Sequence, residues 1–346
     1  MQTKGYQHSL NDHSLFLKHI GNSITIVAIY VDGIIVTGDN LEEISTLKSF
    51  LDDQFKIKDL GYINLFLGLE FNETNGGMVV NQDKFILDLL QAYSMTDCNP
   101  VSAPLPSNLK LFPKMDNPLK EATSYRQLIG KLNFLLHTRP DLSFTVQYLS
   151  QFNQTPCEAH YDAALHVLKY LKGTASQGIF LNDKPLYNIE AYCDSDWAAC
   201  PITRRSVSGF FILFGGTPIS WKSKKQITVS LSSTEAEYRS MRQICSELAW
   251  ISRLLNELGV PNVTPIPLKC DNQAAIYIAK NPVFHERTKH IEVDCHFVRE
   301  KLVDGLISLS HVPTNEQLAD VFTKTLSGPP HVDAVSKLGV LPYPPA

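Results

Sequence analysis

Four acidic residues in the second half of the chain occur in patterns that would place them at one edge of a sheet. Asp194 and Asp271 each come at the end of an alternating apolar and polar segment, which predicts a strand. Glu237 lies on the apolar stripe of a predicted amphipathic helix, where a carboxylate is costly unless it is paired or bound to a metal. Asp320 lies in the second turn of a short predicted helix. These positions predict a carboxylate cluster.

Four carboxylates at one place would repel one another unless cations lay among them. Two Mg²⁺ ions about 4 Å apart, held by carboxylates, are a known device for hydrolysing phosphodiesters. We therefore expect Asp194, Glu237, Asp271 and Asp320 to form a two-magnesium site, in which Mn²⁺ could substitute. Asp196 is an alternative to Asp194, and Asp271 could instead be only the cap of the helix that follows it.

Other residues near these acids are expected to have structural roles. Glu235 is predicted to close a capping box with Ser232 and to lie in line with Arg239. The helix that carries Asp320 is expected to begin at Thr314 or Asn315.

Composition excludes several classes of protein. The chain has 346 residues, a formal net charge of −4 and 44% hydrophobic residues, which predicts two or three ordinary globular domains. Any contact with nucleic acid must then come from a local basic patch. The seven cysteines are scattered without a C-x-x-C pair, which indicates reduced thiols. The N-terminus has no apolar signal segment and no long apolar stretch occurs, so we expect a soluble intracellular protein.

The expected elements form two α/β units around a helical region. The first unit has strands within residues 23–37, joined by a turn at Asp32-Gly33, then a helix after Asn40, strands at 61–71 and 77–80, and a helix at 84–93. A proline-rich linker is expected at 99–120, followed by helices at 124–136, 142–152 and 160–172. The second unit runs from about 187 to 326, with a hairpin turn at Gly215-Gly216 and then a tail that does not pack fully.

Long motifs occur throughout the second unit. They include Tyr192-Cys-Asp-Ser-Asp-Trp, Leu231-Ser-Ser-Thr-Glu-Ala-Glu-Tyr, Cys270-Asp-Asn-Gln-Ala-Ala and Glu316-Gln-Leu-Ala-Asp-Val-Phe-Thr-Lys. These motifs closely resemble the ribonuclease H domain of Ty1/copia-type retrotransposon Pol polyproteins. The resemblance implies an α/β domain with a mixed five-stranded sheet and Mg²⁺-dependent cleavage of the RNA strand of an RNA–DNA hybrid. The family's acidic tetrad falls on the same four acids. Candidate phosphate contacts are Arg204, Arg205, Lys222, Lys224 and Lys225.

The first part of the chain resembles the end of the reverse transcriptase palm of the same family, followed by its helical thumb and connection. Tyr30-Val-Asp-Gly stands where the family has Tyr-x-Asp-Asp, so Asp32 remains and Gly33 replaces the second acid. The upstream strand that supplies the other metal-binding acid is expected to be missing. Since nucleotidyl transfer needs at least two fixed carboxylates, we expect no polymerase activity.

The fold class that follows is an α+β palm remnant with a helical thumb or connection, and then an α/β ribonuclease H-like domain. The expected domains are 1–105, 106–185 and 186–327, with a proline-bearing tail at 328–346. Expected partners are an RNA–DNA hybrid and other retroelement Pol or Gag proteins, with no membrane. The expected location is cytoplasmic retroelement particles or the nucleus.

The sequence also bears on three competing interpretations. A non-catalytic remnant that only binds nucleic acid or a Pol partner is the main alternative, and the intact tetrad argues against it. A transposase or integrase is disfavoured because those sites use three acids. The sequence His285-Glu286…His290 has the wrong spacing for a zinc protease helix. His290, His296 and His311 are candidates for hydrogen bonds near the substrate.

Overall fold

The computed structural model describes residues 1–31, 33–113, 115, 117–260, 263–281, 292–326 and 328–344. The chain forms two compact units. Unit 1 comprises residues 1–71 and 247–263, and unit 2 comprises residues 72–246 and 264–346. The functional boundaries expected near residues 105, 185 and 327 remain predictions. None of the described helices is both long and apolar enough to cross a bilayer.

Unit 1 contains a four-stranded antiparallel sheet whose strands follow chain order. The strands are β1 (Gln7–His8), β2 (Leu15–Ile20), β3 (Ser23–Ile29) and β4 (Ile34–Gly38), after a 3-10 turn η1 (Gln2–Lys4). Helix α1 (Leu41–Phe55) begins at Asn40, whose side chain accepts a hydrogen bond from the Glu43 backbone N–H at 3.0 Å. The predicted strand pair and the predicted helix start are confirmed.

The strand expected at residues 61–71 is interrupted. Two short strands form there instead, β5 (Leu65–Phe66) and β6 (Leu69–Thr74), which pair antiparallel. The turn between them places Leu67 and Gly68 at positive φ, 51° and 76°. Because Leu67 adopts a conformation that is rare for a bulky residue, periodicity alone could not locate this turn.

A helical module follows in unit 2. Its elements are β7 (Gly77–Asn81), α2 (Asp83–Ala92), α3 (Ala122–Leu135), η2 (Pro140–Leu142), α4 (Ser143–Ser150), α5 (Glu158–Gly173) and β8 (Gln177–Asn182). The predicted helices are confirmed. The segment expected to be a linker packs instead of remaining exposed, because Ala103, Leu105 and Leu111 are buried and the latter two belong to the core of the module. The prolines of this segment prevent regular structure without preventing burial.

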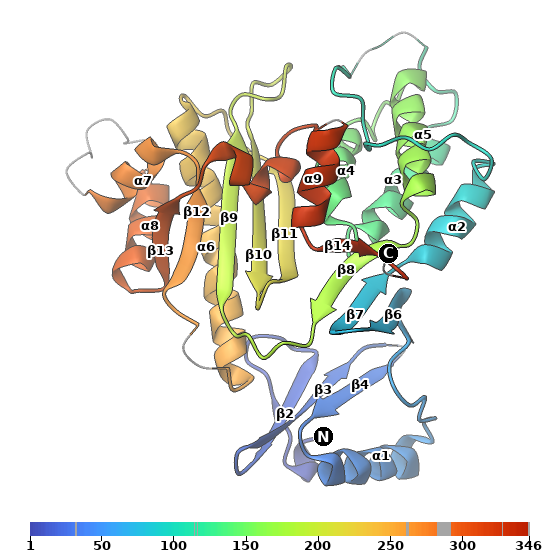
Figure 1. Ribbon diagram of the computed structural model, residues 1–346, viewed down its shortest axis with the longest axis vertical. Coiled ribbons are helices and arrows are strands. Elements are labelled where there is room, and N and C mark those ends of the chain that lie inside the picture. Colours follow the sequence, from blue (N-terminus) through green and yellow to red (C-terminus); the bar gives the residue numbers. More distant parts are fainter. Residues whose placement is uncertain are drawn as a thin grey trace. The chain divides into compact units, whose positions relative to one another are not determined.

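A mixed five-stranded sheet forms the centre of the rest of unit 2 (Figure 1). It contains β9 (Ile189–Asp196), β10 (Val207–Phe214), β11 (Thr217–Lys225), β12 (Ile266–Cys270) and β13 (Ile307–His311). Their order is β11-β10-β9-β12-β13, in which the first three are antiparallel and β12 runs parallel to both of its neighbours. The helices are α6 (Ser233–Glu257), whose residues from 247 onward belong to unit 1, α7 (Gln273–Lys280) and α8 (Glu292–Val303). The predicted mixed sheet and the Gly215-Gly216 turn are confirmed.

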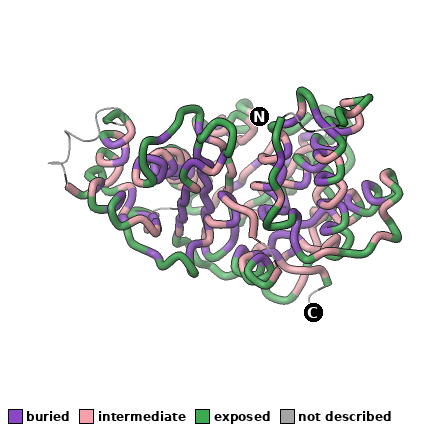
Figure 2. Tube along the Cα trace, turned by 90° about the horizontal axis from the view of Figure 1, so that it is seen from above, coloured by how far each residue is buried: buried purple, intermediate pink, exposed green. Residues whose placement is uncertain are grey.

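The C-terminal segment packs, which makes the prediction of a loose tail wrong. After two short 3-10 helices, η5 (Thr314–Glu316) and η6 (Leu318–Phe322), the chain forms α9 (Pro329–Lys337) and β14 (Val340–Pro342). Strand β14 pairs antiparallel with β8, and Val335, Leu338 and Val340 are buried. Proline is well tolerated in the first turn of a helix, so the Pro-Pro pair begins α9 rather than excluding structure. In Figure 2, buried, intermediate and exposed residues alternate along the Cα trace.

A buried polar network lies under α9. The Arg139 guanidinium forms an ion pair with Asp141, with Nη2 and Oδ2 2.7 Å apart and both side chains fully buried. The Tyr170 hydroxyl donates to Asp141 Oδ2 at 2.7 Å, and His331 Nε2 lies 3.0 Å from the same hydroxyl. This network joins η2, α5 and α9.

Candidate metal centre

Asp194 lies near the end of β9 and is buried. Its carboxylate Oδ2 accepts a hydrogen bond from the Thr323 hydroxyl, which follows η6 directly. Its backbone carbonyl accepts from the Ser240 hydroxyl of α6 at 2.9 Å, and the same hydroxyl lies 3.1 Å from the Gly209 carbonyl. Thr323, just after η6, thus holds the Asp194 carboxylate, and Ser240 of α6 holds its backbone.

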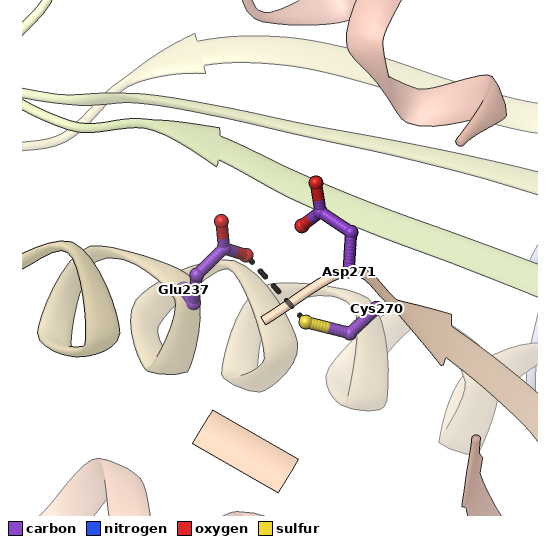
Figure 3. A group of neighbouring side chains, drawn as sticks. All are labelled: Glu237, Cys270 and Asp271. Atoms are coloured by element: carbon purple, nitrogen blue, oxygen red, sulfur yellow. Dashed lines mark hydrogen bonds between the residues drawn. The ribbon is translucent and has the colours of Figure 1, made fainter. Parts of the chain in front are cut away.

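Glu237 lies on the buried face of α6, where the sequence pattern predicted it. Its Oε1 accepts a hydrogen bond from the Ser195 backbone N–H at 3.2 Å. The Cys270 thiol at the end of β12 donates to Glu237 Oε2 at a sulfur–oxygen distance of 3.8 Å, and Figure 3 shows Asp271 beside this pair. The glutamate thus extends from the helix toward the strand ends.

Asp271 follows β12 directly, and its Oδ2 accepts a hydrogen bond from the Thr314 hydroxyl at 3.2 Å. The cap of α7 is the next residue, Asn272, whose side chain accepts from the Ala275 backbone N–H at 2.9 Å. The alternative in which Asp271 is merely a helix cap is therefore wrong. The Asp271 carboxylate is therefore available to the other three acids.

Asp320 lies in η6, and the local structure differs from the predicted helix starting at Thr314 or Asn315. The expected helix is interrupted at Gln317, which separates two 3-10 helices. The Gln317 side chain donates to the Cys193 carbonyl at 2.9 Å and accepts from the Ala319 backbone N–H at 3.1 Å. Contacts to the distant strand β9 therefore determine this break.

The two oxygens of Asp320 have different surroundings. Its Oδ2 forms an ion pair with the Lys324 ammonium at 2.8 Å. Its Oδ1 is buried, and no donor among the described residues reaches it. A buried acceptor without a donor is costly and needs an explanation, such as a bound ion.

The four predicted acids form two overlapping groups, which the structure brings to one edge of the sheet. One carboxylate oxygen each of Asp194, Asp271 and Asp320 lie within 4.8 Å of one another, and atoms of Glu237, Cys270 and Asp271 meet the same limit. Asp271 belongs to both groups. Among the described residues, Asp196 appears in neither group, so the geometry favours Asp194 over this alternative.

Burial and mutual repulsion change the acidity of these groups. Burial, followed by the charges of Asp320 and Asp271, raises the pKa of Asp194 to about 7. Burial also raises the pKa of Glu237 well above its ordinary value, and the nearby Cys270 and Asp194 add to this shift. The pKa of Asp320 is raised by burial although its ion pair with Lys324 opposes the shift. Burial and the neighbouring acids therefore destabilise the ionised forms of these three carboxyl groups.

The predicted basic residues differ in exposure. Arg204 and Arg205 lie in the exposed loop between β9 and β10, and Lys222 and Lys224 are exposed on the edge strand β11. Lys225 is half-buried, and its ammonium donates to Gln151 Oε1 and to Cys200 Sγ, each at 2.8 Å. Lys225 therefore has partners within the chain, whereas the other four have exposed side chains.

The expected pairing of Glu235 with Arg239 is confirmed, and the expected capping box forms in part, because the Glu235 carboxylate accepts from Leu231, one residue before the expected cap. The Ser232 hydroxyl accepts from the Glu235 backbone N–H at 3.2 Å, and Glu235 Oε2 accepts from the Leu231 backbone N–H at 2.8 Å. Glu235 also pairs with Arg239 at 2.7 Å.

The candidate histidines do not join the cluster in the part of the chain that the structure describes. His296 and His311 are exposed. His290, the whole of His285-Glu286…His290, and Asp32 of the polymerase motif lie outside the described residues.

Sequence reasoning missed several residues that contact the acids. Cys270, Thr314 and Thr323 each donate to one of them, and Lys324 pairs with Asp320. The signal for Thr323 and Lys324 was available, because residues three and four positions after Asp320 lie on the same side of a helical turn.

Comparison with known proteins shows similarity in both parts of the chain. The family described as "Reverse transcriptase (RNA-dependent DNA polymerase)" matches residues 1–107. The chain is 41% identical over 344 residues to the "Retrovirus-related Pol polyprotein from transposon RE1" of Arabidopsis thaliana, covering 99% of this chain and 24% of that protein. It is 39% identical to the "Uncharacterized mitochondrial protein AtMg00810" of the same plant, covering 65% of this chain and 93% of that protein.

A solved structure also shows similarity, to a small degree. The crystal structure of RNase H1 from the halophilic archaeon Halobacterium salinarum is 18% identical and covers 39% of this chain and 94% of that chain, with a TM-score of 0.25.

These observations define the class as a retroelement protein with a reverse transcriptase segment followed by a mixed five-stranded sheet. The chain belongs to the Ty1/copia-type retrotransposon Pol family, and it spans about a quarter of the length of the Pol polyproteins that it matches.

Proposed function

We propose that residues 186–327 hydrolyse the RNA strand of RNA–DNA hybrids in a Mg²⁺-dependent reaction. The observation that carries the proposal is the position of Asp271, which has a carboxylate oxygen within 4.8 Å of a Glu237 oxygen in one group and of Asp194 and Asp320 oxygens in the other. One edge of the sheet therefore offers oxygens for more than one divalent ion. This arrangement suits two-metal hydrolysis of a phosphodiester.

Three features of the site fit such ions. The ligand atoms are mainly carboxylate oxygens, which Mg²⁺ and Mn²⁺ prefer. Asp320 Oδ1 is buried and lacks a donor among the described residues. The raised pKa values of Asp194 and Glu237 mean that burial and nearby acids destabilise the ionised carboxylates, which a bound cation would favour. Asp194, Glu237, Asp271 and Asp320 would hold the metal pair.

When bound, the pair of ions supplies activation of the attacking water and neutralisation of the leaving oxygen. The protein's own contribution is preorganisation. Thr323 fixes the Asp194 carboxylate, and the Ser195 backbone N–H with the Cys270 thiol fixes Glu237. Because these donors are already in place, no reorganisation of the acids is needed during the reaction.

The substrate would be recognised mainly through its backbone. Arg204, Arg205, Lys222 and Lys224 are exposed and would contact phosphates. The half-buried Lys225 would contribute only by breaking its present bonds. Choice of the RNA strand would come from duplex shape and 2′-hydroxyl contacts rather than base reading.

We propose that this chain has no polymerase activity. Gly33 stands where the family motif has its second aspartate, so this turn offers only Asp32 as an acid. We further propose that the chain works with other retroelement Pol or Gag proteins in cytoplasmic particles or the nucleus, because its relatives are named as transposon Pol polyproteins.

Cleavage of a labelled RNA–DNA hybrid tests the proposal. We expect Mg²⁺-dependent cleavage of the RNA strand, loss of about 100-fold or more in Asp271→Asn, and unchanged activity in the exposed control Asp333→Asn. Equal cleavage by Asp271→Asn would contradict the proposed site. No cleavage by the wild-type chain would favour a non-catalytic remnant.

A further inference from the structure

Lys324 lies beside the acidic cluster and was not among the predicted site residues. Its ammonium is 2.8 Å from Asp320 Oδ2, and its side chain is 39% exposed while that of Asp320 is 15% exposed. The preceding residue, Thr323, binds Asp194. Two consecutive side chains at the end of η6 thus contact two neighbouring acids.

The charge balance makes this lysine unusual. Oxygens of Asp194, Asp271 and Asp320 lie within 4.8 Å of one another. Among the described residues, Lys324 is the one Lys or Arg that forms an ion pair with any of these three acids. Without divalent ions, its ammonium is therefore the main positive charge in contact with the group.

We propose that Lys324 is the internal counter-cation of this site, which competes with divalent cations for Asp320 and is released toward the substrate phosphate when they bind. The inference rests on the proposed function for its last step. The flexible four-carbon stem and the partial exposure of Lys324 allow its ammonium to leave Asp320 without moving the backbone. A released ammonium beside the cluster would then stabilise negative charge that develops on the phosphate.

A second lysine provides a matched control. Lys337 pairs with Asp333 at the same i,i+4 spacing and the same 2.8 Å distance, and its side chain is 43% exposed. Asp333 is 66% exposed and belongs to neither acidic group. The two lysines thus form the same kind of ion pair, but only Lys324 pairs with an acid of the cluster. Of these two lysines, we therefore expect only Lys324 to affect metal binding.

The test is Mn²⁺ binding, measured by electron paramagnetic resonance in the full chain without nucleic acid. We expect Lys324→Met to bind Mn²⁺ about three to ten times more tightly, because a competing positive charge is removed. Lys324→Arg, which keeps the charge, should bind as the wild type does, and so should Lys337→Met. Unchanged or weaker Mn²⁺ binding by a folded Lys324→Met would overturn the proposal.

Cleavage of the RNA–DNA hybrid by the same variants tests the release of Lys324 toward the substrate phosphate. We expect Lys324→Met to lower kcat about tenfold or more at saturating Mg²⁺ although it binds metal more tightly. An unchanged kcat would overturn the release toward the phosphate. If the wild type does not cleave the hybrid but the change in Mn²⁺ affinity appears, the proposed function fails while the competition with divalent cations stands.

Discussion

Replacing Asp194 with asparagine should stabilise the metal-free protein at alkaline pH. Asp194 is buried, and its pKa is raised to about 7 from an ordinary value of 3.8. Between these two values the folded state binds more protons than the unfolded state, so the free energy of unfolding falls as the pH rises. Above about pH 7 the full cost of the buried charge is present. Asparagine keeps an acceptor for Thr323 and removes that cost.

The size of the effect follows from the same two values. A difference from 3.8 to about 7 corresponds to about 4 kcal/mol at pH 8. The Thr323 hydrogen bond is stronger to a carboxylate than to an amide, so we expect a net gain of about 1–3 kcal/mol. Only part of the cost is present at pH 5, so the net effect should be about 2–3 kcal/mol less favourable there, which leaves about no gain or a small loss.

Urea unfolding in the presence of a chelator, at pH 5 and at pH 8, measures these differences. Asp333→Asn is the control, because that side chain is 66% exposed and lies outside the cluster. Saturating Mg²⁺ should reverse the order and stabilise the wild type more than Asp194→Asn. A loss of stability in metal-free Asp194→Asn at pH 8, or a gain that is equal at both pH values, would refute the electrostatic reasoning.

Three further changes test the packing and the substrate contacts. Gly209→Ala would place a methyl group 2.7 Å from the Phe322 Cβ, so we expect a loss of about 1–3 kcal/mol in urea unfolding together with weaker Mn²⁺ binding, and unchanged values would show that η6 is not held by this contact. Asp141→Asn leaves the fully buried Arg139 without a counter-charge and should cost about 3–5 kcal/mol in the same assay, whereas a cost below about 1 kcal/mol would contradict the buried pair. Replacing both Arg204 and Arg205 with alanine should reduce the slope of log binding constant against log salt concentration for the hybrid by about one to two units, which corresponds to one to two phosphate contacts. An unchanged slope would exclude the two arginines as phosphate ligands.

The positions of the acids could be predicted because strand alternation and helix periodicity are local signals. Asp194 and Asp271 lie where alternating segments end, and Glu237 lies on a stripe that repeats through α6. These patterns determine which face is buried before any tertiary contact is known. The mixed sheet followed from the same signals together with the family resemblance.

Long-range contacts explain the errors around Asp320. The break between η5 and η6 depends on Gln317, which bonds the carbonyl of Cys193, 124 residues away in the sequence. Local propensity cannot reveal such a partner, so a continuous helix was predicted.

The tail and the linker were misjudged for a different reason. Proline-rich composition predicts a linker at 99–120 and a tail that does not pack fully, although proline only excludes certain backbone hydrogen bonds. Leu105 and Leu111 in the linker and Val335 in α9 are apolar residues that fill cores of unit 2. Their burial depends on contacts with neighbouring elements, which local sequence patterns do not reveal.

In our proposal, four acids from two strand ends and two helical segments form one site for divalent cations. Titration of the metal-free chain with Mn²⁺, for the wild type and for Asp271→Asn, tests it most directly because Asp271 belongs to both acidic groups. We predict binding by the wild type and a loss of affinity of about tenfold or more in Asp271→Asn. Equal Mn²⁺ binding by the two chains would contradict the account.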